Sequence, residues 1–146
     1  MGFSAGGHLA STAATHIAPA NPDSPDPLER VSSRPDVQIL LYPVISMGPL
    51  GHESSRICLL GDTPTPTLVA LLSNENQVTA TTPPAYLMHS TADHIVPVAN
   101  SDQYAAALKK QNIPYEYQRG NFGEHGCGVQ PFWTTPCLAW LRQQGF

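Results

Sequence analysis

The sequence is poor in charge, and above all in positive charge. Only 12 % of its 146 residues are charged, about half of the ~25 % usual in globular proteins. Seven Lys and Arg stand against eleven Asp and Glu, which gives a net charge of −4, and Lys109-Lys110 is the one adjacent basic pair. Nucleic acids and anionic membranes are bound by clustered cations, so neither is predicted as a partner.

Long apolar runs and paired cysteines are also missing. No apolar run approaches the ~20 residues of a membrane span, and no signal peptide is visible, which leaves the compartment open. The three cysteines include no Cys-x-x-Cys pair, so a disulfide framework is not predicted. His125 and Cys127 lack a third ligand at a zinc spacing, so no metal is predicted either.

What the sequence does contain is a set of alternating strand and helix patterns. Hydrophobic residues make up 41 %, enough for a core, and fifteen Pro and eleven Gly indicate many loops. Three short runs predict buried or amphipathic strands, at 37–42, 85–90 and 114–119. Helices are predicted over 6–16, 98–111 and 132–143, the last with a break near Pro136, and over shorter pieces at 55–60 and 68–72. Residues 18–35 are predicted as loop. This order predicts an α/β fold with a parallel sheet.

The sharpest motif lies at the start of the chain. Gly2-Phe3-Ser4-Ala5-Gly6 is a G-x-S-x-G followed by a predicted helix. In such a motif the serine sits on a strained strand-to-helix turn, and small residues two before and two after it avoid a collision. The turn exposes the serine Oγ and directs backbone N–H groups at an oxyanion. Ser4 is therefore a candidate nucleophile.

A base and a carboxylate follow in the order that this motif requires. In α/β hydrolases the chain order is Ser, Asp, His, each after a strand. Asp93 follows the strand that ends at Ser90, and His125 lies in the glycine-rich loop after the next strand. One helix and one strand fill the gap between them, as a parallel crossover needs. The sequence thus predicts a catalytic triad of Ser4, Asp93 and His125.

Each of these residues also has a purely structural interpretation. Ser4 and Asp93 could cap helices, and His125 could be a loop residue. His94 competes weakly for the role of base. His8 and His16 are expected in packing or on the surface, and His89 is expected to be buried and bonded to backbone. Aromatic residues are assigned to the core before a substrate platform: Tyr42, Tyr86, Trp133 and Trp140.

With these residues assembled, the chain resembles the α/β-hydrolase superfamily. More narrowly it is similar to bacterial acetylxylan and bifunctional feruloyl-acetylxylan esterases. The resemblance covers nearly the whole chain and rests on residues 1–11, 34–36, 39–47, 74–75, 83–85, 93–98, 100–101 and 123–126. It implies that Ser4 is the nucleophile, Asp93 the acid and His125 the base, and that the backbone N–H of Ala5 is one oxyanion donor. Glu124 and Cys127 depart from the family's glycine and aromatic residue beside the histidine.

The resemblance also implies an upstream half that this sequence does not contain. The family has an early His-Gly-Gly stretch for a second oxyanion donor and a strand that leads into the serine, whereas only Met1 precedes Gly2 here. Residues 1–146 are therefore expected to be the C-terminal part of an α/β-hydrolase fold, with the N-terminal strands absent. The strand at 37–42 is then expected to present a bare apolar edge, open to association with another chain.

The implied activity is hydrolysis of carboxylic esters through an acyl-enzyme, without a cofactor. The expected substrate is a small-molecule or polysaccharide ester, such as an acetyl or feruloyl group on xylan. Two alternatives stay open. One is a serine peptidase of the prolyl-oligopeptidase type, although Ala5 followed by Gly6-Gly7 fits esterases better. The other is an inactive or truncated hydrolase fragment.

Overall fold

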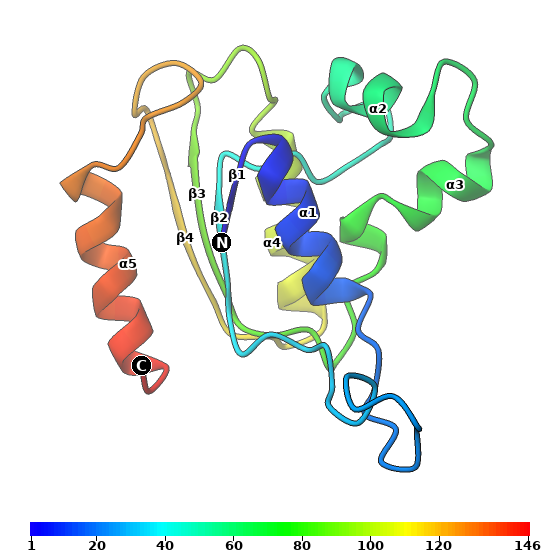
Figure 1. The fold of residues 1–146 in the computed structure, drawn as a ribbon. Coiled ribbons are helices and arrows are strands. Elements are labelled where there is room, and N and C mark those ends of the chain that lie inside the picture. The colour runs from blue at the N-terminus through cyan, green and yellow to red at the C-terminus, as the bar shows by residue number, and fades with distance from the viewer.

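The computed structural model describes all residues, 1–146, and contains a four-stranded sheet in the order β1-β2-β3-β4 (Figure 1). All neighbouring strands are parallel. The strands are β1 (Gly2–Phe3), β2 (Gln38–Leu41), β3 (Ala85–Ser90) and β4 (Tyr115–Gly120). Because the strands run in one direction, the segments that follow them meet at one end of the sheet.

Helices cover both faces of this sheet (Figure 1). Helices α1 (Ala5–Thr15) and α4 (Ala99–Lys110) lie on one face, and α5 (Pro131–Gln143) lies on the other. Between β2 and β3 the chain forms α2 (Glu53–Leu60), α3 (Pro66–Leu71) and a 3₁₀ turn, η1 (Asn74–Asn76). The parallel sheet with flanking helices confirms the α/β class predicted from the sequence.

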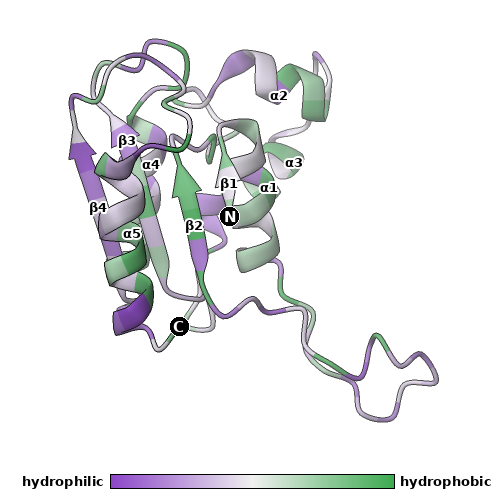
Figure 2. Ribbon diagram, turned by 60° about the vertical axis from the view of Figure 1, so that its left-hand side comes forward, coloured by the Kyte–Doolittle hydropathy of each residue, from purple (hydrophilic) through white to green (hydrophobic).

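Alternation along the central strands divides the core into two halves. Leu40 and Leu87 join a cluster with α4 residues such as Tyr104, whereas Leu41 and Met88 join a cluster with aromatic residues of α5. Strand β3 is buried at all six positions because it is covered on both faces. The edge strand β4 is only partly buried, which agrees with the amphipathic strand predicted there, and most of its residues are hydrophilic (Figure 2).

Small residues allow α1 to lie close against the sheet. Its buried positions are Gly7, His8, Ser11 and Ala14. Asn74 of η1 is fully buried and donates through Nδ2 to the His8 carbonyl at 3.2 Å and to Ser11 Oγ at 2.7 Å. This side chain therefore ties the segment between β2 and β3 to α1.

The expected bare edge of β2 is wrong over half of that strand. Gly2 and Phe3 pair in parallel with Leu40 and Leu41. Two residues are enough for this pairing because the backbone of Ser4 continues the ladder, donating from its N–H to the Leu41 carbonyl at 3.0 Å. Only the first half of β2, at Gln38 and Ile39, has no partner on that side.

The expected break near Pro136 is also wrong. Helix α5 runs without interruption from Pro131 to Gln143, with Pro136 inside it. A proline in this position frees the carbonyl four residues earlier, which belongs to Phe132. That carbonyl accepts a hydrogen bond from Gln118 Nε2 of β4 at 2.9 Å. The helix tolerates the proline because a neighbouring strand supplies the missing donor.

We expect Pro136→Ala to raise the free energy of unfolding by about 1–3 kcal/mol, because alanine restores the N–H and is the better helix former. Pro131→Ala is the matched control, since proline at the first turn of a helix replaces no hydrogen bond. Urea unfolding followed by circular dichroism measures both. Equal effects of the two variants would contradict this explanation of α5.

Candidate active site

Ser4 lies on a sharp turn between β1 and α1. Its backbone has φ 51° and ψ −123°, a conformation that non-glycine residues seldom adopt. Three backbone hydrogen bonds hold it: its N–H donates to Leu41, and its carbonyl accepts from Gly7 and Val44, both at 2.9 Å. The strained turn is thus fixed by its neighbours on β2 and α1, and it exposes the Ser4 side chain at the end of the sheet.

The glycines of the motif differ in what they do. A Cβ on Gly2 would lie 2.0 Å from the Gly6 carbonyl oxygen, and a Cβ on Gly7 would lie 2.5 Å from Pro43 Cβ. A Cβ on Gly6 would meet nothing within 4 Å. The expected collision two residues after the serine is therefore wrong. The steric requirement falls on Gly7 instead, because α1 passes close to the turn that follows β2.

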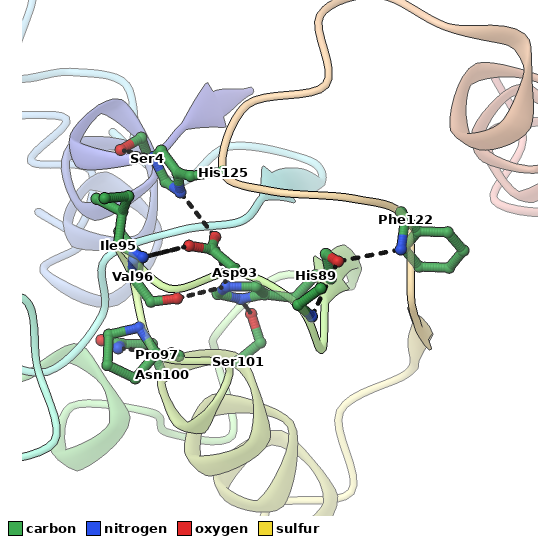
Figure 3. A network of polar contacts seen from close by, with 12 residues as sticks. Ser4, His89, Asp93, Ile95, Val96, Pro97, Asn100, Ser101, Phe122 and His125 are labelled. Atoms are coloured by element: carbon green, nitrogen blue, oxygen red, sulfur yellow. Dashed lines mark hydrogen bonds and ion pairs between the residues drawn. The ribbon is translucent and has the colours of Figure 1, made fainter.

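The structure brings Ser4, Asp93 and His125 together at the C-terminal ends of the strands (Figure 3). His125 Nδ1 lies 2.7 Å from Asp93 Oδ2, and His125 Nε2 lies 2.8 Å from Ser4 Oγ. A carboxylate accepts only, so Nδ1–H donates to Asp93, and Nε2 is left to accept from the Ser4 hydroxyl. One neutral tautomer of His125 satisfies both contacts.

The Asp93 side chain has no exposed surface, and both of its carboxylate oxygens accept hydrogen bonds. Oδ1 accepts from the N–H groups of Ile95 and Val96, both at 2.9 Å, and Oδ2 accepts from His125. Burial by itself would raise the pKa of Asp93. The hydrogen bonds from His125, Val96 and Ile95 outweigh burial and hold this pKa below its ordinary value. Asp93 is therefore a buried, ionised carboxylate.

The contacts of these residues differ from those expected if Ser4 and Asp93 capped helices or if His125 were only a loop residue. Ser4 stands at the N-cap position of α1, but its side chain caps no backbone N–H. Asp93 does not cap α4, whose N-cap is Val98. His94 is 77 % exposed, and its Nε2 lies 3.9 Å from Glu124 Oε1, away from Ser4. Of the histidines near the turn, it is His125 that contacts both partners.

Two further residues shape the loop that carries His125, and the sequence did not single them out for this. The Tyr42 ring lies 5.0 Å from the His125 ring, edge to face, and its backbone also has positive φ, 39°. Ser90 accepts from the Phe122 N–H at 3.0 Å and donates to the Gly123 carbonyl. The sequence predicts Tyr42 in the core before a substrate platform, and Tyr42 does belong to a core cluster. Its place at the end of a strand and before Pro43 is a signal for its further contact with His125.

His8, His16 and His89 agree with their expected places. His8 is buried, and its Nε2 lies 2.8 Å from the Leu72 carbonyl oxygen, while His16 is exposed. Burial lowers the pKa of His8 below its ordinary value. His89 is fully buried and contacts the Val96 carbonyl, as predicted, and it contacts two side chains as well.

An apolar cavity of about 510 Å³ opens between α1 and α2 and includes Ala5 in its lining. Ala5 is the first residue of α1, so its N–H has no acceptor four residues back in the helix. A larger and more polar groove, about 960 Å³, runs beside α2 and α3 and includes none of Ser4, Asp93 and His125. The smaller cavity is the one that adjoins the serine turn.

No group of three His, Cys, Asp or Glu side chains is placed to hold a metal ion, and the three cysteines are free. Burial raises the pKa of the Cys127 and Cys137 thiols. None of the helices combines the length and the hydropathy that crossing a membrane requires.

The model of one protein family, BD-FAE, matches residues 1–108, which include Ser4 and Asp93. The chain belongs to the BD-FAE family. It is 39 % identical over 129 residues to endo-1,4-beta-xylanase B of Butyrivibrio fibrisolvens and 35 % identical over 133 residues to the acetylxylan esterase of Xylanibacter ruminicola. These alignments cover 88 % of this chain but only 20 % and 25 % of the two relatives.

Among solved structures, this BD-FAE chain is similar to an acetyl ester-xyloside bifunctional hydrolase from Caldicellulosiruptor lactoaceticus. The TM-score is 0.95 at 46 % identity, over 99 % of this chain and 56 % of that one. The predicted resemblance to α/β-hydrolase esterases of this kind is confirmed. This chain spans about half the length of that hydrolase.

We expect Gly7→Ala to lower the free energy of unfolding by about 1–3 kcal/mol, because its Cβ is forced against Pro43. Gly6→Ala is the matched control in the same helical turn: with open space around its Cβ, it should raise the free energy of unfolding by up to about 1 kcal/mol. Thermal unfolding compares the two. Destabilisation by Gly6→Ala as large as by Gly7→Ala would contradict the assignment.

Proposed function

We propose that this chain carries the acyl-transfer centre of a serine esterase that hydrolyses acyl esters on carbohydrate. The observation that carries the proposal is the chain of hydrogen bonds from Ser4 Oγ to His125 at 2.8 Å and from His125 to Asp93 at 2.7 Å. A nucleophile, a base within hydrogen-bond distance of it and a group that orients the base are the three parts of such a centre.

Ser4 acts as nucleophile and His125 as general base. Ser4 Oγ bonds to the ester carbonyl carbon while its proton passes to His125 Nε2, and the carbonyl oxygen becomes an oxyanion. The intermediate collapses when the bond to the alcohol oxygen breaks and His125 returns the proton to that oxygen, leaving an acyl-serine. Water then attacks the acyl-serine with the same base, which releases the acid and restores Ser4.

Asp93 orients His125 and stabilises its protonated form. Its ionised, buried carboxylate holds Nδ1–H and so leaves Nε2 free to accept the Ser4 proton. The backbone N–H of Ala5 is proposed as one donor to the oxyanion, since it is a free first-turn amide directly after the nucleophile. One such donor is worth about 10²–10³ in rate.

The substrate class rests on the relatives and on the cavity beside Ala5. An acetylxylan esterase and an acetyl ester-xyloside hydrolase are among the proteins to which the chain is similar. The cavity is lined by apolar side chains such as Leu9, Met47 and Leu59, together with a few polar groups from α1 and α2. Such a lining suits an acyl group more than a charged one. We propose acetyl or feruloyl esters of xylan as substrates.

Labelling with a fluorophosphonate tests the nucleophile. We expect the chain to be labelled at Ser4, because an activated serine attacks phosphorus as it attacks an ester carbonyl. Ser4→Ala should abolish the labelling, and His125→Ala should slow it by at least about 10²-fold. Ser32→Ala, an exposed serine in the loop before β2, is the control. Labelling that survives Ser4→Ala would refute the assignment, and a chain that takes no label would be an inactive fragment.

Substrate comparison tests the class of bond. We expect hydrolysis of nitrophenyl acetate and acetylated xylan, lost in Ser4→Ala, and no cleavage of a proline-containing amide. An amine leaves the tetrahedral intermediate less readily than the alkoxide of a sugar hydroxyl. The lining of the cavity also contains no carboxylate that could bind the amino group of a peptide. Comparing feruloyl with acetyl esters then assigns the acyl group. Faster cleavage of the amide would favour a peptidase of the prolyl-oligopeptidase type instead.

A further inference from the structure

His89 is a buried histidine that the proposed mechanism does not use. It is the fifth of six residues of β3, four positions before Asp93, and its side chain has no exposed surface. A buried imidazole needs partners for both nitrogens. His89 finds them on two different elements: Nε2 lies 3.0 Å from the Val96 carbonyl oxygen, and Nδ1 lies 2.8 Å from Ser101 Oγ on α4.

These contacts define which nitrogen of His89 carries the proton. The Val96 carbonyl can only accept, so Nε2 must be protonated. Nδ1 of the neutral ring is then an acceptor, and Ser101 donates to it through its hydroxyl. Burial lowers the pKa of His89 below its ordinary value, which keeps the ring neutral. The result is a fixed N–H that points out of β3 toward the loop after it.

The same N–H lies near the Asp93 carboxylate. His89 Nε2 is 3.3 Å from Asp93 Oδ2, the oxygen that also receives His125 Nδ1–H (Figure 3). The Nε2–H of His89 donates to the Val96 carbonyl, and Oδ2 lies beside it, close enough to feel the positive end of this N–H dipole. Two histidines, one from β3 and one from the loop after β4, converge on a single carboxylate oxygen.

We propose that His89 is a positioning residue of the hydrolytic site: its Nε2–H fixes the loop after β3 through the Val96 carbonyl and, 3.3 Å from Oδ2, favours the position of the Asp93 carboxylate in which His125 meets it. The proposal rests on the function proposed above. His89 contacts neither Ser4 nor the space beside it, so it acts only through Asp93. Oδ1 is fixed by two backbone amides, whereas Oδ2 is contacted only by the two histidines, His125 at 2.7 Å and His89 at 3.3 Å.

The neutrality of His89 is part of this role. Asp93 and His125 are the titratable groups that face it, and α4 contributes the uncharged Ser101. A cation at His89 would compete with the His125 imidazolium for Asp93 and repel it. A neutral N–H orients the carboxylate without that competition. Since a displacement of about 1 Å can cost 10²-fold in rate, a small loss of restraint on Oδ2 is enough to be measured.

Two variants with a side-chain amide distinguish the role of Nε2 of His89 from that of Nδ1. In His89→Gln the side-chain amide extends as far as Nε2 and offers an N–H there, whereas in His89→Asn it extends only as far as Nδ1. His94→Asn, an exposed histidine on the same loop as Asp93, is the control. Hydrolysis of nitrophenyl acetate by each variant is measured across pH and normalised to the fraction labelled by fluorophosphonate.

We expect His89→Asn to lower kcat by about 10–100-fold with KM changed by less than about threefold, and His89→Gln to keep kcat within about fivefold. In His89→Asn the acid limb of kcat/KM should move to higher pH. The reason is that the charge on Oδ2 then acts undiminished on His125 and favours its protonated, inactive form. His89→Gln should leave this limb in place.

Equal losses in the two variants, or an unshifted acid limb in His89→Asn, would overturn the proposal and leave His89 a structural residue. Histidine ring ¹H–¹⁵N spectra give a test without turnover. They should show His89 protonated at Nε2, and the His125 Nδ1–H resonance should move in His89→Asn but not in His94→Asn. A His89 protonated at Nδ1 would refute the proposal. A wild-type chain that takes no label would refute only the proposed function.

Discussion

The buried carboxylate of Asp93 is the interaction around which this end of the molecule is organised. An ionised group without exposed surface is costly unless donors surround it, and Asp93 receives them from two loops. Its own loop supplies two backbone amides and the loop after β4 supplies His125, while His89 of β3 lies 3.3 Å from Oδ2. Satisfying one charge therefore fixes the path of two loops relative to the sheet. The same contacts that make the carboxylate tolerable also orient the histidine that reaches Ser4.

A second constraint acts at Ser4 itself, where a positive φ must be maintained by the surroundings. The parallel register meets this need, because β1 and β2 end side by side and the Leu41 carbonyl accepts from the Ser4 N–H. Gly7 lets α1 approach Pro43, which keeps the turn closed. Ser4 is the single residue between β1 and α1. The strained backbone of this proposed nucleophile and the close packing of α1 both follow from that short connection.

Much of the site could be predicted because topology decides it. In a parallel sheet, residues that directly follow strands meet at one end, so the order of Ser4, Asp93 and His125 was enough to bring them together. The sequence could not show that Gly7 rather than Gly6 meets an obstacle, because the obstacle is Pro43, distant along the chain. The sequence also could not show that Pro136 leaves α5 unbroken, because the donor that satisfies the freed Phe132 carbonyl is Gln118 of β4. His89 was expected to be buried, but its proximity to Asp93 depends on how the loop folds back.

The segment between β2 and β3 is held differently from the loops that carry Asp93 and His125. Two buried asparagines fasten it: Asn74 bonds to α1, and Asn100 of α4 accepts from the amides of Ile45 and Ser46, both at 3.0 Å. Both anchors lie at the base of the segment, whereas α2 has no buried residue. The cavity beside Ala5 is therefore bounded on one side by α1, which is anchored by buried hydrogen bonds, and on the other by α2, which buries no residue. Substitutions in α2 can then change the cavity without disturbing Ser4, Asp93 or His125, since none of their hydrogen bonds involves that helix.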